Sequence, residues 1–162
     1  MEPIKLIYNN PFGESRKGFS DWITPCGNGW LSGFFDGDGS ISINKANNRL
    51  NISIVQKNRD VLDLLAEVYN GNVYYYSKSR NTYRFVIDKI DSVKDIYDNY
   101  FKYYPSRTLK FSRLVLIHRF YELKDLKAYK APINSILNKC WIDFFDKWNK
   151  KIKIDKNDII QK

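Results

Sequence analysis

One short apolar segment constrains the fold of this chain more than any other feature of its sequence. Glycine recurs at every fourth position there, as Gly29, Gly33 and Gly37, among apolar residues with helical spacing. The three glycines would therefore form one stripe along a predicted helix over 28–37, with Gly39 at its end. Each glycine costs about 1 kcal/mol relative to alanine in a helix. A stripe of three indicates close approach by another helix, and a loosely packed helix is the alternative.

The same segment ends in a carboxylate, Asp38, placed where the negative end of the helix dipole disfavours it. A bound cation would remove this penalty, whereas a solvated turn aspartate is the plain alternative. The chain has a single histidine, His118, and its two cysteines, Cys26 and Cys140, lack zinc-ligand spacing. Any metal at Asp38 is therefore expected to be a hard cation bound through oxygen.

After Gly39 the sequence changes from helical to alternating periodicity. Two pairs of alternating segments with turn residues between them predict two β-hairpins, and apolar stripes predict the helices around them. Four antiparallel strands with helices on one face give an α+β domain whose other sheet face is polar and basic. The predicted strands are 40–44, 50–54, 72–78 and 82–88, and the predicted later helices are 59–69 (capped by Asn58), 91–103, 110–126 and about 132–150.

The chain of 162 residues is long enough for one ordinary domain. Scattered Pro and Gly over 1–28 predict an N-terminal arm, 29–126 the folded core, and 127–162 basic C-terminal helices. No apolar run reaches the roughly 18–20 residues that span a bilayer, and the first residues lack the apolar core of a signal peptide. A soluble, intracellular protein without membrane contact is therefore expected.

The net charge of +9 indicates an acidic partner such as nucleic acid or an anionic membrane surface. Residues 1–99 hold 12 Lys or Arg and 12 Asp or Glu, whereas residues 100–162 hold 15 and 6. Acidic residues are nonetheless absent over 39–59 and 68–87, where both hairpins are predicted. Asn, Ile, Lys and Tyr, which have A/T-rich codons, make up 65 of 162 residues, which suggests an A/T-rich genome such as that of a mitochondrion or chloroplast.

The segment Leu31–Gly39, LSGFFDGDG, resembles the LAGLIDADG motif of homing endonucleases. The match includes the glycines, both aspartates and the immediate entry into a hairpin, and the resemblance extends from about Trp30 to Phe120. Two further stretches are similar to the family, Ile54-Val55-Gln56-Lys57 and Tyr104-Pro105-Ser106-Arg107-Thr108-Leu109-Lys110. The resemblance implies the αββαββα fold, a four-stranded antiparallel saddle sheet backed by helices, here with extra C-terminal helices.

For function, the resemblance implies a homing endonuclease that makes a metal-dependent, staggered double-strand cut in a long, pseudo-palindromic DNA site. Because the motif occurs once, the expected enzyme is a homodimer that pairs the stripe of Gly29, Gly33 and Gly37, although pairing with a different chain is also open. The expected partner is double-stranded DNA, with no small-molecule cofactor. An intron RNA maturase and a catalytically inactive DNA-binding protein of the same fold are the alternatives.

The resemblance also assigns expected roles to site residues. Mg²⁺ would be held by Asp38, the Gly37 carbonyl, DNA phosphate oxygens and water, and Mn²⁺ or Ca²⁺ are expected to fit the same site. Gln56 would orient the attacking water, Lys110 would stabilise charge on the phosphate, and Asp36 would cap or brace the helix. The alternative is that Gln56 and Lys110 are simply solvated.

The resemblance implies that the polar strand face and the hairpin turns recognise the DNA sequence. For the tyrosines, ordinary sheet packing is an equal alternative. The expected DNA-binding residues are Ser40, Ser42, Asn44, Lys45, Arg49, Asn51, Ser53, Tyr74, Tyr76, Lys78, Arg80 and Arg84.

Overall fold

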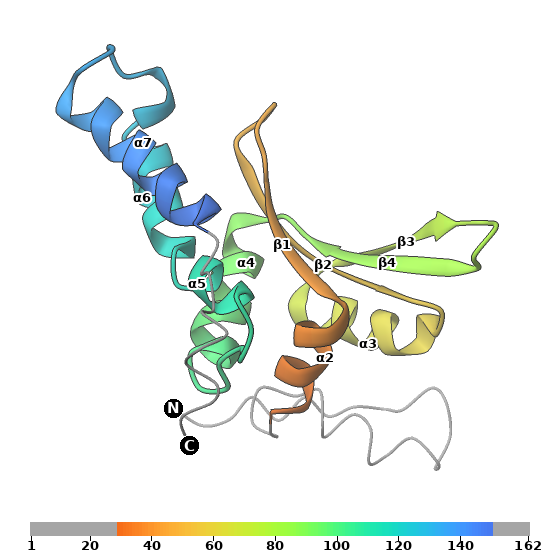
Figure 1. The fold of residues 1–162 in the computed structure, drawn as a ribbon. Coiled ribbons are helices and arrows are strands. Elements are labelled where there is room, and N and C mark those ends of the chain that lie inside the picture. Colours follow the sequence, from red (N-terminus) through yellow and green to blue (C-terminus); the bar gives the residue numbers. More distant parts are fainter. Residues whose placement is uncertain (1–28, 151–162) are drawn as a thin grey trace, which may run out of the picture. The chain divides into compact units, whose positions relative to one another are not determined.

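The computed structural model describes residues 29–150, which divide into two compact units between Ile117 and His118 (Figure 1). The N-terminal arm expected over 1–28 and the last part of the expected C-terminal helices lie outside the described residues. The core expected over 29–126 spans the division. No helix within 29–150 combines the length and the apolar character that crossing a membrane requires.

Helix α2 (Trp30–Asp38) opens the first unit, and its apolar side chains Leu31 and Phe35 are fully buried. Ser32 fixes the helix from its buried side: its amide donates to the Tyr100 hydroxyl at 3.0 Å, and its own hydroxyl donates to the Tyr104 carbonyl. The N-cap is Gly29, which offers no side-chain oxygen to the first turn. Packing of one face therefore holds this helix, rather than capping.

Four strands form one antiparallel sheet in the order β1-β2-β4-β3, from β1 (Gly39–Asn44), β2 (Arg49–Gln56), β3 (Asn72–Ser77) and β4 (Thr82–Ile87). Both predicted hairpins are confirmed. In the tight turns Asn48 and Asn81 adopt positive φ, which asparagine tolerates better than most residues.

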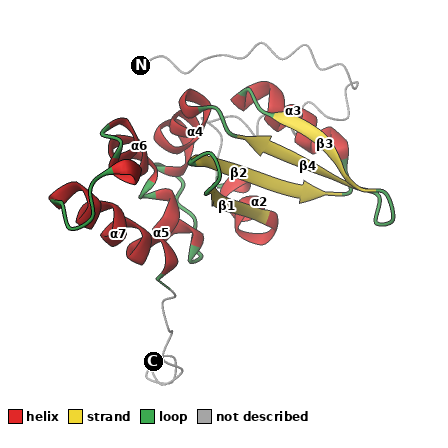
Figure 2. Ribbon diagram, turned by 90° about the horizontal axis from the view of Figure 1, so that it is seen from above, coloured by secondary structure: helices red, strands yellow, loops and turns green. Residues whose placement is uncertain are grey.

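The helices α2 and α3 (Arg59–Tyr69) lie on one face of this sheet, as both views of the ribbon show (Figures 1 and 2). Alternate strand residues point to that face and form the core, among them Ile52, Ile54 and Phe85. Within residues 29–117 no helix covers the other face, which we call the open face. The predicted α+β architecture is confirmed.

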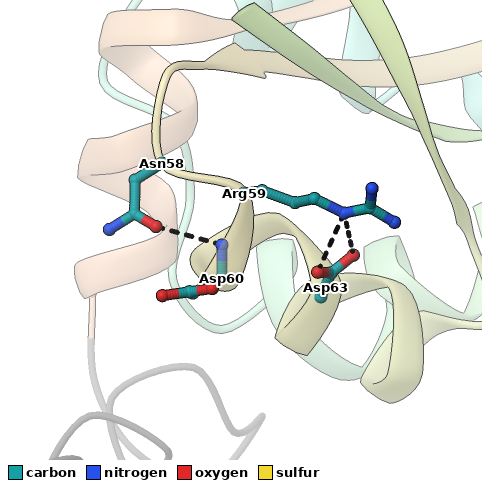
Figure 3. A network of polar contacts seen from close by, with 4 residues as sticks. All are labelled: Asn58, Arg59, Asp60 and Asp63. Carbon is teal, nitrogen blue, oxygen red and sulfur yellow. Dashed lines mark hydrogen bonds and ion pairs between the residues drawn. The ribbon is translucent and has the colours of Figure 1, made fainter.

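The predicted boundaries of α3 are confirmed by its caps. The Asn58 side chain accepts a hydrogen bond from the Asp60 amide at 3.0 Å, and Asn70 ends the helix in the left-handed conformation (φ 52). Figure 3 shows this cap beside the Arg59–Asp63 ion pair, whose Nε to Oδ2 distance is 3.1 Å.

Three of the later helices differ from their predictions. The helix predicted over 91–103 is α4 (Ile90–Ile96) followed by the π-helix η2 (Tyr97–Phe101). The helix predicted over 110–126 is broken into α5 (Lys110–Leu114) and α6 (Ile117–Asp125). At the break the Leu116 amide bonds back three residues, to the Arg113 carbonyl, and this tighter turn keeps Leu114 and Ile117 buried together.

The second unit comprises α6 beyond Ile117, a 3-10 turn (Ala128–Lys130) and α7 (Ile136–Asn149). The last helix, predicted to begin near Pro132, starts only after Ser135, because Asn134 has a left-handed φ of 67. The Ser135 hydroxyl caps it by accepting from the Asn138 amide at 3.1 Å. Aromatic rings fill this unit, with Phe120 and Phe144 buried 5.7 Å apart between ring centroids.

The final glycine of the motif has a packing role that can be tested. A Cβ at Gly39 would overlap the Phe35 ring and lie 2.5 Å from the Phe35 carbonyl oxygen. We expect Gly39→Ala to lower the free energy of unfolding by about 1–3 kcal/mol in equilibrium urea unfolding, because a crowded core has no room for the methyl group.

The matched control is Ser40→Ala at the next, exposed position, for which a change within about 0.5 kcal/mol is expected. Equal stability of the two variants would contradict the close approach of Phe35 to Gly39.

Candidate functional site

The sequence-predicted catalytic residues meet at the C-terminal end of α2. Asp38 is the last residue of the helix and Gln56 the last of β2. The β1–β2 pairing places Gly39 opposite Ile54, so the end of β2 lies beside the helix end. The Gln56 amide nitrogen Nε2 donates to Asp38 Oδ2 at 2.5 Å. This contact fixes one oxygen of an otherwise exposed carboxylate.

Lys110, the first residue of α5, reaches the same helix end from a distant part of the chain. Its Nζ donates to the carbonyl oxygens of Phe35 at 2.9 Å and Asp36 at 2.6 Å. Carbonyls in the last turn of a helix have no partner within the helix, and they carry the negative end of its dipole. Burial lowers the pKa of Lys110, and the nearby carboxylates of Asp36 and Asp38 act in the opposite direction.

Asp36 holds the loop that delivers Lys110. Its carboxylate accepts hydrogen bonds from the Ser106 hydroxyl, from the Arg107 amide at 2.8 Å and from the Thr108 hydroxyl at 3.1 Å. Asp36 was expected to cap or brace the helix. In the structure its carboxylate connects α2 to residues 106–108. The sequence analysis names Ser106 and Thr108 only within the stretch that resembles the family, and it does not predict that their hydroxyls donate to Asp36.

The two aspartates of the motif therefore differ in how many of their carboxylate oxygens are already hydrogen-bonded. Asp36 accepts hydrogen bonds from three donors, whereas Asp38 is exposed and only its Oδ2 accepts a hydrogen bond from a residue within 29–150. Within residues 29–150 no group of three His, Cys, Asp or Glu side chains could hold a metal ion. Mg²⁺ binds through one or two carboxylates and keeps water or phosphate as its other ligands, so the exposed Asp38 oxygen and the Gly37 carbonyl fit part of such a shell.

The glycine stripe lies on an open surface of α2. Gly29, Gly33 and Gly37 are exposed, and a Cβ built on any of them would meet nothing within 4 Å. Packing among the described residues therefore does not require glycine at these positions. A groove of about 230 Å³ runs beside the stripe, lined among others by Ser32, Tyr104 and Arg107.

Several expected DNA-binding residues share the open face of the sheet. The register places Ser40 opposite Ser53, Ser42 opposite Asn51, and Tyr74 opposite Arg84. Ser42 donates to Asn51 Oδ1 at 3.0 Å, which orders the polar centre of the first hairpin.

Three of the side chains expected to contact DNA have partners within the protein. Ser53 is only 3% exposed and its hydroxyl accepts from Arg84 Nη2 at 3.2 Å, which corrects the expectation that Ser53 touches DNA directly. Asn44 uses its side-chain oxygen to accept from the Ala46 amide within the turn. Arg49 lies 3.9 Å from the Asp88 carboxylate, between exposed side chains. The remaining turn residues Lys45, Lys78 and Arg80 are exposed.

Comparison with known proteins gives one family model, described as LAGLIDADG endonuclease, which matches residues 31–121. A probable intron-encoded endonuclease of Debaryomyces hansenii is 35% identical over 144 residues, covering 76% of this chain and 22% of that protein. An intron-encoded RNA maturase of Saccharomyces cerevisiae is 37% identical over 151 residues, covering 90% of this chain and 23% of that protein. The chain thus spans less than a quarter of these two relatives.

Among solved structures, the fold is similar to the LAGLIDADG homing endonuclease I-GzeII in complex with its DNA target, with a TM-score of 0.59 and 18% identity over 78% of this chain and 44% of that one. It is also similar to the homing endonuclease I-TnaI, with a TM-score of 0.56 and 20% identity over 80% of this chain and 90% of that one. At these identities the likeness is one of fold.

The different surroundings of the two aspartates predict unequal losses of stability when each is replaced. Asp36→Ala should lower the free energy of unfolding by about 1–3 kcal/mol, because three donors of the 106–108 loop lose a charged acceptor. Asp38→Ala should cost less than about 1 kcal/mol, because its carboxylate is exposed and faces the unfavourable end of the helix dipole.

Both variants are compared with the unchanged protein by equilibrium urea unfolding. If Asp38→Ala proved the more destabilising variant, the assignment of Asp36 as the structural aspartate would be wrong.

Proposed function

Because the chain belongs to the LAGLIDADG endonuclease family, we propose that it is a site-specific homing endonuclease that cuts both strands of a long DNA site. The observation that carries this proposal is the convergence of Asp38, Gln56 and Lys110 on the exposed end of α2. Phosphodiester hydrolysis needs an oriented water and compensation of the charge that develops on the phosphate, and these residue types supply both.

Each residue has a distinct proposed task. Asp38 and the Gly37 carbonyl would hold Mg²⁺, which when bound would activate water and neutralise charge on phosphate oxygens. The Gln56 amide, held against Asp38, orients the attacking water. The Lys110 amine, held by the Phe35 and Asp36 carbonyls beside these carboxylates, would stabilise charge that develops on the phosphate of the bound DNA.

The DNA is proposed to lie on the open face of the sheet. That face carries Ser40, Ser42 and Asn51, whose hydroxyl and amide groups suit hydrogen bonds to base edges in the major groove. Strand β2 has 8 residues, and at about 3.3 Å per residue such a strand follows about eight base pairs. Acidic residues are absent from both hairpin windows, which favours contact with phosphates.

Two copies of the chain are proposed to act together. Among residues 29–150, each copy of the chain has one exposed carboxylate at this helix end, that of Asp38, while a cut in both strands needs a reaction site at each strand. Pairing of the open glycine stripes would bring the ends of two α2 helices together, and with them two Asp38 side chains. A homodimer of this kind reads a pseudo-palindromic site.

A second candidate function is support of RNA splicing, favoured by the 37% identity to an intron-encoded RNA maturase of Saccharomyces cerevisiae. The exposed Asp38 carboxylate and its contact with Gln56 favour the nuclease, because RNA binding alone needs neither. An organelle with an A/T-rich genome is proposed as the source only from the high content of Asn, Ile, Lys and Tyr.

The nuclease proposal predicts that Asp38→Asn loses cleavage and keeps DNA binding. A duplex is first selected for binding from a randomised pool in Ca²⁺, and its single-turnover cleavage is then measured in Mg²⁺. We expect the variant to cleave at least about 100-fold more slowly, with little change in Kd, because the substitution keeps the side chain's shape and removes the charge.

The control variant is Asp63→Asn, which removes the carboxylate of a surface ion pair on α3 and should leave cleavage unchanged. Normal cleavage by Asp38→Asn would remove Asp38 from the metal site.

Helix pairing predicts that Gly33→Leu converts the dimer to a monomer. A leucine on the stripe would force the two α2 backbones apart, while within the monomer the position is open to solvent. Sedimentation velocity gives the mass of both proteins, with the exposed α7 variant Lys139→Leu as the control for an added surface leucine. A Gly33→Leu protein that still sediments as a dimer would refute pairing through this stripe.

A further inference from the structure

The open face of the sheet is divided into two chemically different halves. The half formed by β1 and β2 carries small polar side chains, including Ser40, Ser42 and Asn51. The half formed by β3 and β4 carries two large aromatic rings, Tyr74 and Tyr76, which are 56% and 58% exposed. The Cα pairing of Tyr74 with Arg84, and the contact of Arg84 with Tyr76, assign both rings to this face.

The neighbouring Tyr75 is also 51% exposed, but its ring and its hydroxyl both have partners. Tyr75 belongs to the opposite face, where its ring packs edge-on against Tyr83 with centroids 4.9 Å apart. Its hydroxyl is bound as well, donating to Asn81 Oδ1 at 2.8 Å. The described residues give Tyr74 no such ring or hydrogen-bond partner, and Tyr76 only the cation described next.

The Arg84 guanidinium contacts both the Tyr76 ring and the centre of the sheet. Its guanidinium carbon lies 5.7 Å from the centroid of the Tyr76 ring, a cation–π contact. The same guanidinium donates to the buried Ser53 hydroxyl at 3.2 Å, which fixes it to the centre of the sheet. Tyr76 is thereby held on one side by an anchored cation while more than half of the residue stays in water.

Positive charge borders these rings. Lys78 and Arg80 lie in the turn that follows β3, both exposed, and neither forms an ion pair among residues 29–150. No acidic residue occurs over 68–87. Exposed aromatic rings beside a basic edge are the combination by which proteins bind single-stranded nucleic acid, with bases stacked on the rings and phosphates on the cations.

We infer that the surface formed by Tyr74, Tyr76 and Arg84 is a stacking site for unpaired nucleotide bases. This inference depends on one part of the proposed function, namely that the open face binds nucleic acid. Base faces are covered by neighbouring bases in a duplex and become available only in single strands, loops or melted segments. The β1–β2 half suits the edges of paired bases, whereas the β3–β4 half suits the faces of unpaired ones.

The test compares binding of fluorescently labelled oligothymidylate, oligouridylate and a mixed-sequence duplex to the full chain, by anisotropy at one fixed salt concentration. Tyr74→Leu and Tyr76→Leu should each weaken binding of the single strands by at least about fivefold, the loss of one stacked base. Tyr74→Phe and Tyr76→Phe keep the ring and should bind within about twofold of the unchanged protein.

The duplex is the comparison for paired bases, and the leucine variants should lose less affinity for it than for the single strands. The midpoint of urea unfolding, expected to stay unchanged in all four variants, controls for folding. Tyr103→Leu, which removes a 69% exposed tyrosine outside the sheet, controls for loss of a surface aromatic ring. Stronger binding of oligouridylate than of oligothymidylate would identify RNA as the source of the unpaired bases, and equal binding would indicate that base stacking alone is read.

The inference would be overturned by single strands that do not bind, by leucine variants that bind them normally, or by leucine variants that lose as much affinity for the duplex. A loss in the phenylalanine variants would show that the hydroxyl groups make the contact, which also contradicts stacking. Because duplex cleavage is measured separately with Asp38→Asn, failure here leaves the nuclease proposal standing, and failure of cleavage leaves this inference standing.

Discussion

The end of helix α2 must find donors for its last carbonyl oxygens, and most of the proposed site follows from how it does so. The Phe35 carbonyl accepts from the Gly39 amide, where the chain turns into β1, and from Lys110, which also binds the Asp36 carbonyl. The lysine that satisfies the helix end is thus brought beside Asp38. A local requirement of the backbone places a cation, an exposed carboxylate and the Gln56 amide together.

The same requirement explains why two aspartates so close in sequence have different surroundings. Asp36 is turned toward the 106–108 loop and accepts three hydrogen bonds from it, which keeps the approach to Lys110 in place. Asp38 follows at the exposed helix end and binds only Gln56 among the described residues. The carboxylate that holds the loop and the carboxylate that we propose to bind metal are therefore different residues, and a change at one need not disturb the other.

Sequence patterns were sufficient for the elements whose signals are local. The hairpins follow from strict alternation and asparagine turns, and α3 from its Asn58 and Asn70 caps. The break at Val115-Leu116 was not predicted, because Leu114 and Ile117 stay buried on both sides of it and leave the apolar pattern intact. Contacts between distant segments, such as Thr108 with Asp36, leave no periodic signal. The lysine itself was expected only because its motif resembles a family.

The central claim is that two such helix ends act as one metal-dependent reaction centre on duplex DNA. The most direct measurement treats a randomised double-stranded DNA library with the purified protein, in Mg²⁺ and in EDTA, and sequences the ends produced. We predict staggered cuts in Mg²⁺ alone, at one long and nearly palindromic site. Absence of cutting with any divalent cation would contradict the claim, and metal-dependent cuts at sites without two-fold symmetry would contradict the pairing of identical chains.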